Sequence, residues 1–115
     1  MKIPKIKRHK FFGKPYKIKF GSIKENTPEA ELKAIAERCG IADPDDILAL
    51  TDSRQARHRT ILISHEINDD KTLLRVLLDE SLHACDERID NDIVDIYATD
   101  IADFLWRCGY RRING

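Results

Sequence analysis

Three side chains that do chemistry, Asp79, Glu80 and His83, interrupt an otherwise apolar stretch at positions 73–85. The apolar residues recur at helical spacing and predict a helix with one buried stripe, made by Leu74, Leu78, Leu82 and Cys85. Asp79 and His83 are four positions apart, so they share one face of that helix, about one turn from each other. Glu80 lies on the neighbouring edge of the same face.

This triplet has the composition of a hydrolytic metal site. Carboxylate and imidazole groups both bind divalent metal ions. A glutamate between two such ligands can take a proton from metal-bound water without binding the metal itself. The spacing is that of the zinc-protease pattern H-E-x-x-H, except that Asp79 stands where the first histidine would be. It indicates either a metallopeptidase with a carboxylate as first ligand, or a relative that has lost the chemistry.

The elements that must position this helix form a small α+β domain. Tyr16, Ile18 and Phe20 alternate with lysines and predict a half-buried strand. A further strand is expected at 60–64, which is rich in β-branched residues. Another is expected at 47–50, where a helical turn is the equal alternative. Helices are expected at 27–39, 70–87 and 92–108, the first beginning with Thr27 as cap and Pro28. The last has a predicted core face of Ile93, Ile96, Tyr97, Ile101, Phe104 and Leu105.

The chain of 115 residues has the length of one domain. We expect a basic N-terminal arm at 1–13, with little regular structure, followed by a single zincin-like domain at 14–115. Its fold class is α+β, a small antiparallel or mixed sheet packed against three helices. No apolar run is long enough to span a membrane. Three widely spaced cysteines suggest reduced thiols, and hence a cytoplasmic location.

The order of these elements and the motif helix together resemble one family. Residues 72–84 contain T-L-L, then L-L-D-E-x-L-H-A. This is similar to small zincin-like metallopeptidases encoded by bacteriophages, whose helix reads T-L-L-H-E-x-L-H-A. The similarity is good over 60–108 and loose over 14–59. It implies that Glu80 is the general base, that Asp79, His83 and Asp95 are metal ligands, and that the protein acts in the cytoplasm of a phage host.

The departure at Asp79 bears on which metal such a site would hold. Two carboxylates and one histidine leave an ion less positive than two histidines and one carboxylate do. Oxygen-rich ligation also suits Mn²⁺ better than a histidine-rich set would. The alternatives are therefore that the site binds Zn²⁺, that it binds Mn²⁺ or another divalent ion, or that it binds no metal. Asp95 also lies on an acidic helix face, for which exposure to solvent is the default.

A net charge of zero conceals an uneven distribution. Positions 1–24 carry nine lysines and arginines and no acid, while 25–115 carry 20 acids against 11 bases. The first of these cations, which would contact nucleic acid or an acidic partner, are Lys2, Lys5, Lys7, Arg8 and Lys10. The alternative is that they form a solvated edge that balances the acidic remainder of the domain.

Three functions follow from these patterns. The first is a metal-dependent peptidase acting on a peptide added along an edge strand at Thr60–Ser64. The second is a catalytically inactive relative that serves as a binding or regulatory protein. The third is a nucleic-acid-associated accessory protein that uses the basic N-terminus.

Overall fold

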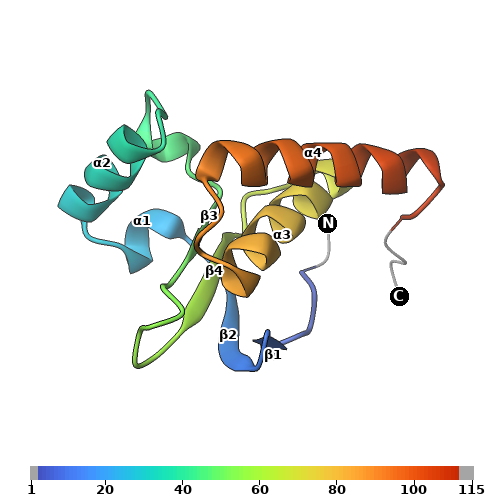
Figure 1. Ribbon diagram of the computed structural model, residues 1–115. Coiled ribbons are helices and arrows are strands. Elements are labelled where there is room, and N and C mark those ends of the chain that lie inside the picture. The colour runs from blue at the N-terminus through green and yellow to red at the C-terminus, as the bar shows by residue number, and fades with distance from the viewer. Residues whose placement is uncertain (1–2, 112–115) are drawn as a thin grey trace.

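A four-stranded mixed sheet forms the centre of the protein, which we describe from a computed structural model over residues 3–111. The strand order is β1 (Arg8–Phe11), β2 (Lys14–Gly21), β4 (Thr60–Ser64) and β3 (Ala49–Thr51) (Figure 1). β2 and β4 are parallel, whereas the two outer pairs, β1 with β2 and β3 with β4, are antiparallel. The predicted α+β class with a small mixed sheet is confirmed.

The helices form layers around this sheet. α3 (Asp70–Cys85) packs on the sheet, and α4 (Asn91–Arg107) lies against α3 on the side away from the sheet (Figure 1). The short helices α1 (Ile23–Asn26) and α2 (Glu29–Arg38), with a 3₁₀ turn, η1 (Pro44–Asp46), lie between β2 and β3 in the chain. They provide the long crossover that a parallel pair such as β2 and β4 requires.

Alternation along β4 explains why both faces of the sheet are covered. Ile61 and Ile63 point into the core shared with α3, together with Leu73 and Val76. Leu62, between them, points into a second core, where Leu32 and Ala36 of α2 are buried. A strand that is apolar on both faces belongs inside a sheet. Its position corrects the expectation that Thr60–Ser64 is an edge strand, because the two free edges belong to β1 and β3.

The buried stripe of α3 differs by one position from the predicted one. Leu73, Val76 and Ala84 are the buried residues that face the sheet. The predicted stripe is only half-buried at its leucines, and its last member is exposed: Leu74, Leu78, Leu82 and Cys85. The helix itself begins as expected, since the Asp69 carboxylate accepts a hydrogen bond of 2.9 Å from the backbone N–H of Thr72.

The predicted core face of α4 was wrong for five of its six members. The buried residues of this helix are Val94, Ala98 and Ala102, four apart along the helix. Small side chains let α4 lie close against α3, whose contacts with it are extensive. The large apolar residues are consequently turned outward. The exposed fraction of each residue lies between 39% and 65% for Ile93, Ile96, Tyr97, Ile101 and Phe104.

Two smaller expectations also need correction. Residues 8–11 of the expected irregular arm form β1, paired in register with β2 from Arg8 opposite Lys17 to Phe11 opposite Lys14. The helix expected from residue 27 begins at Glu29, with Pro28 at the cap position and no side-chain cap. Among residues 3–111, no helix combines the length and the apolar character that a membrane crossing needs.

Candidate functional site

Asp79 and His83 lie side by side on α3, as their spacing predicts. His83 Nε2 is 3.1 Å from Asp79 Oδ1. Both side chains are mostly covered, with 23% of His83 and 19% of Asp79 exposed. Asp79 raises the pKa of His83, mainly through this hydrogen bond, although burial of the imidazole acts in the opposite direction. The pair is therefore a preformed contact between an imidazole and a carboxylate.

Glu80 points in a different direction, toward the sheet. It follows Val76 by four positions and precedes Ala84 by four, so it lies in line with the buried stripe of α3. Its Oε2 accepts a hydrogen bond from the hydroxyl of Thr51, the last residue of β3. The carboxyl group is thus largely removed from solvent, with one neutral donor to hold it.

Burial raises the pKa at which the Glu80 carboxyl group loses its proton. Loss of solvation raises the pKa of Glu80 to about 7, and the negative charge of Asp79 contributes in the same direction. The hydrogen bond from Thr51 and the charge of His83 oppose that rise. A carboxyl group whose pKa lies near the working pH is suited to general acid–base catalysis.

The three residues line an open groove. The free edge strand, from Leu48 through Thr51 to Ser53, lines the same groove. Leu48 and Asp52 direct their backbone groups toward β4, since the N–H of Ser64 bonds to the Leu48 carbonyl and the N–H of Asp52 to the Thr60 carbonyl. Alternation then directs the backbone groups of Ala49 and Thr51 to the free edge. A peptide strand laid there would pass beside Glu80.

The third predicted ligand, Asp95, is engaged by a different partner. Asp95 on α4 has 67% of its side chain exposed, and it pairs with Arg75 of α3 at 3.8 Å. Within residues 3–111, no group of three or more histidine, cysteine or carboxylate side chains is arranged to hold a metal ion. Ligation by Asp79, His83 and Asp95 therefore stays a prediction.

Two of the donors do suit a divalent cation in chemistry and spacing. Two ligands that are each about 2.1 Å from a tetrahedral ion lie roughly 3.4 Å apart, close to the 3.1 Å between His83 Nε2 and Asp79 Oδ1. If they bound an ion, they would supply two of the three protein ligands that a hydrolytic zinc site needs. A third donor could come from solvent, from substrate, or from Asp95 if it left Arg75.

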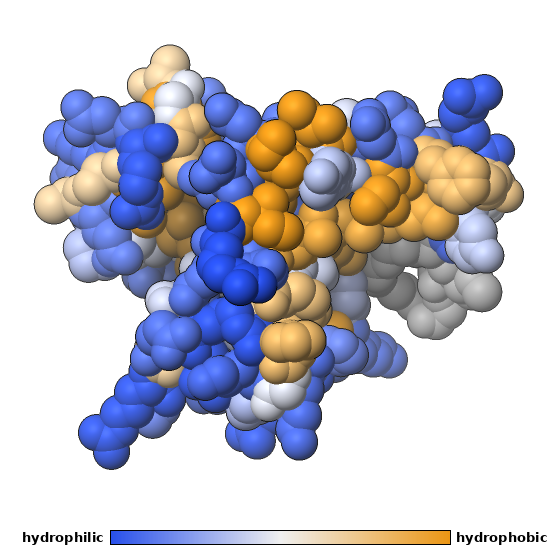
Figure 2. Space-filling view, in the orientation of Figure 1, coloured by the Kyte–Doolittle hydropathy of each residue, from blue (hydrophilic) through white to orange (hydrophobic). Residues whose placement is uncertain are grey.

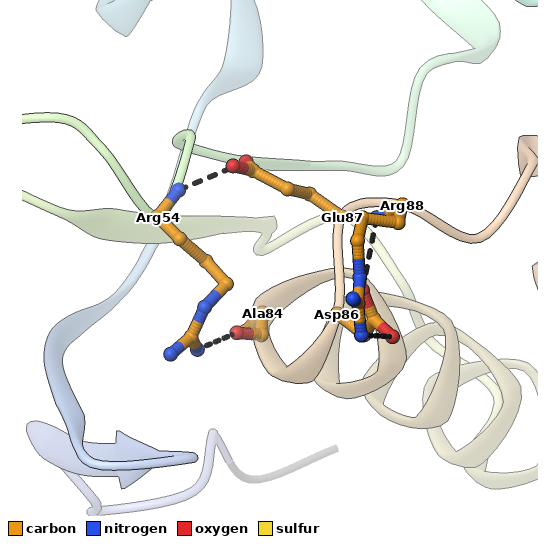
Figure 3. A network of polar contacts seen from close by, with 5 residues as sticks. All are labelled: Arg54, Ala84, Asp86, Glu87 and Arg88. Atoms are coloured by element: carbon orange, nitrogen blue, oxygen red, sulfur yellow. Dashed lines mark hydrogen bonds and ion pairs between the residues drawn. The ribbon is translucent and has the colours of Figure 1, made fainter.

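Sequence reasoning missed the residues that hold the groove in place. Thr51 gives no signal in the sequence, because it meets Glu80 only through the fold. Arg54 holds the loop after β3 in place. Its guanidinium donates hydrogen bonds to the carbonyls of Phe11, Phe12 and Ala84. Figure 3 shows this arginine at the C-terminal end of α3, where Glu87 also accepts a 3.0 Å hydrogen bond from its backbone N–H. The loop is thereby fixed to the end of the helix that carries the site.

The predicted basic contacts are only partly within the described chain. Lys2 lies outside the described residues. Four more are exposed, namely Lys5, Lys7, Arg8 and Lys10. Lys7 and Arg8 also border the groove, so cations lie near the site as well as at the N-terminal end.

Comparison with protein-family models, with curated proteins and with solved structures found no match to this chain. The similarity to phage-encoded zincin-like metallopeptidases therefore rests on the motif residues of α3 and on the order of the elements.

Proposed function

We propose that this protein is a zincin-like, metal-dependent hydrolase of peptides. The observation that carries the proposal is the contact between His83 Nε2 and Asp79 Oδ1, beside the buried carboxyl of Glu80 and facing a groove. Asp79 and His83 would hold the cation, which when bound supplies a Lewis acid and a more acidic water. Zn²⁺ and Mn²⁺ are the candidate ions.

The residues of the chain have separable roles in this proposal. Glu80 accepts a proton and returns it to the leaving amine, a role that its pKa of about 7 supports. Thr51 orients that carboxyl group through its hydroxyl. The outward backbone groups of Ala49 and Thr51 would bind the substrate as an added strand. We propose that the protein acts in the cytoplasm of a phage host.

A specific observation favours a second candidate. Among residues 3–111 only two donors converge, and Asp95 is engaged by Arg75. A catalytically inactive relative that binds a peptide along β3, without a metal, would need nothing more than the groove and the free edge. The exposed cations near the N-terminus would let such a protein also approach nucleic acid.

Titration of the purified protein with Zn²⁺ and with Mn²⁺ separates these candidates. We expect binding that is lost in His83→Asn and retained in the matched control His65→Asn, an exposed histidine just after β4. Asp79→His should tighten zinc binding at least about tenfold, since it restores a second imidazole ligand. Asp95→Asn tests the assignment of the third ligand. Metal affinity should fall in this variant if Asp95 binds the ion.

Activity tests the rest of the proposal. Glu80→Gln should abolish peptide hydrolysis and leave metal affinity unchanged, because it removes the base and no ligand. Failure of the wild-type protein to bind either ion at about 100 µM would reject the hydrolase and favour the inactive, peptide-binding relative.

A further inference from the structure

The outer face of α4 carries large apolar side chains that the rest of the described chain leaves exposed to solvent. We call this the α4 face and define it by Ile93, Ile96, Tyr97, Ile101 and Phe104. Their exposed fractions run from 39% for Ile93 to 65% for Phe104. Figure 2 shows hydrophobic side chains gathered along this helix. A contiguous patch of this kind on a small domain marks an interaction surface.

The spacing along this face is that of a helix-pairing surface. Ile93, Tyr97, Asp100 and Phe104 follow one another at intervals of four, three and four, as the a and d positions of a coiled coil do. The opposite side of the helix is already occupied, since Val94, Ala98 and Ala102 are buried in the contact with α3. A second helix can therefore pack on α4 only at the α4 face.

The same positions are symmetric about the middle of the helix, between Ala98 and Thr99. Ile93 and Phe104 are equally far from this point, and so are Tyr97 and Asp100. In an antiparallel pair of identical helices, residues that are equidistant from the centre lie at the same height. Ile93 of one copy would thus meet Phe104 of the other, and the reverse, as a twofold axis requires.

Charge follows the same symmetry. Asp90, immediately before α4, and Arg107, its last residue, are also equidistant from the midpoint. Neither forms an ion pair within residues 3–111. In an antiparallel pair these opposite charges meet at both ends, whereas a parallel pair would bring like charges together. The central layer would pair the hydroxyl of Tyr97 with the carboxylate of Asp100, a polar contact that sets register.

We propose that the α4 face binds a second copy of this chain, with the two α4 helices antiparallel about a twofold axis through their midpoints. The inference is independent of the proposed hydrolase activity. A single pair of 17-residue helices is small beside the roughly 800 Å² per partner of a standard interface, so we expect a dissociation constant in the micromolar range.

Sedimentation equilibrium of the full chain tests the proposal at concentrations from about 5 to about 500 µM. We expect the mass to rise from the 13.3 kDa of one chain toward that of two. Phe104→Lys and, separately, Ile93→Lys should each weaken dimerisation at least about tenfold. The matched control is Ile6→Lys, at a residue 48% exposed and outside α4, and it should dimerise like the wild type.

A charge exchange tests the antiparallel arrangement. Asp90→Arg and Arg107→Asp should each weaken the dimer, and the double variant should recover it, because the exchanged charges again meet as opposites. Circular dichroism shows which variants remain folded, and the Ile93→Lys result stands if Phe104→Lys loses helix. The proposal is overturned by a wild-type monomer throughout the range, by full dimerisation of both lysine variants, or by a folded double variant that stays as weak as the single ones.

Discussion

Glu80 on α3 accepts a hydrogen bond from the hydroxyl of Thr51 on β3, 29 positions earlier in the chain. This contact joins the helix that carries the candidate site to the edge strand that borders the groove. It also places a carboxyl group in the apolar layer between helix and sheet, where its charged form is poorly solvated. The consequence is a protein whose stability and proton chemistry should both change near neutral pH.

Glu80→Gln should stabilise the protein above neutral pH. The pKa of Glu80 is about 7 in the folded protein against an ordinary value of 4.5, so folding favours the protonated form. The stability that this preference contributes is complete below about pH 4.5 and is lost as pH rises through about 7, by on the order of 3 kcal/mol at most. Glutamine does not ionise, so the variant should keep its stability over this pH range. Urea unfolding at pH 5 and pH 8.5 measures the difference, and equal pH slopes in variant and wild type would contradict it.

Thr51→Val should raise the pKa of Glu80 further. The hydroxyl of Thr51 stabilises the carboxylate, so its removal leaves burial and the charge of Asp79 less opposed. Carboxyl carbon chemical shifts followed by NMR over a pH series give the value directly. Thr60→Val is the matched control, because Thr60 lies on the neighbouring strand and makes no side-chain contact with Glu80. The idea fails if both variants titrate like the wild type.

The strands and helices could largely be predicted, because they depend on local patterns. The run Ile61-Leu62-Ile63 is a buried strand, and α3 begins at Asp70 as expected. The faces of the helices were harder to predict. On α4 the residues that pack closely are alanines, so assigning the largest apolar residues to the core selected the wrong side.

The candidate site was predictable only within α3. The contact between Asp79 and His83 follows from a spacing of four on one helix, which local geometry determines. The partner of Glu80 and the position of Asp95 depend on how β3 and α4 pack against that helix. Neither the pairing of Thr51 with Glu80 nor that of Arg75 with Asp95 has a local signature. Long-range contacts of this kind come from the fold as a whole.

Asp79→Asn should lower the pKa of His83. The hydrogen bond that the His83 imidazole donates to Asp79 is the largest cause of the raised pKa, and an uncharged amide stabilises the imidazolium less. Because the folded pKa of His83 is raised, the stability it contributes is present below pH 6.5 and lost as pH rises past the folded value. Asp79→Asn should remove much of that dependence. Proton NMR of the imidazole ring measures the pKa, with Asp95→Asn as control, since Asp95 pairs with Arg75.

Arg54→Ala should destabilise the protein more than any other change in the loop after β3. The Arg54 guanidinium donates to the Phe11 carbonyl at 2.7 Å and to that of Phe12 at 2.9 Å, and it also reaches the carbonyl of Ala84 near the end of α3 (Figure 3). Removing it leaves three carbonyls without this donor, and we expect a loss of about 2–4 kcal/mol in the free energy of unfolding.

Two comparisons separate this role from a general effect of charge. Arg54→Lys keeps the charge but cannot reach three carbonyls with a single ammonium group, so it should lose most of the same stability. Arg57→Ala removes an exposed arginine from the same loop and should change stability by less than about 0.5 kcal/mol. Urea unfolding of the three variants provides the measurement. If Arg54→Ala is no less stable than Arg57→Ala, the loop is held to α3 by Glu87, Ser53 and the backbone instead.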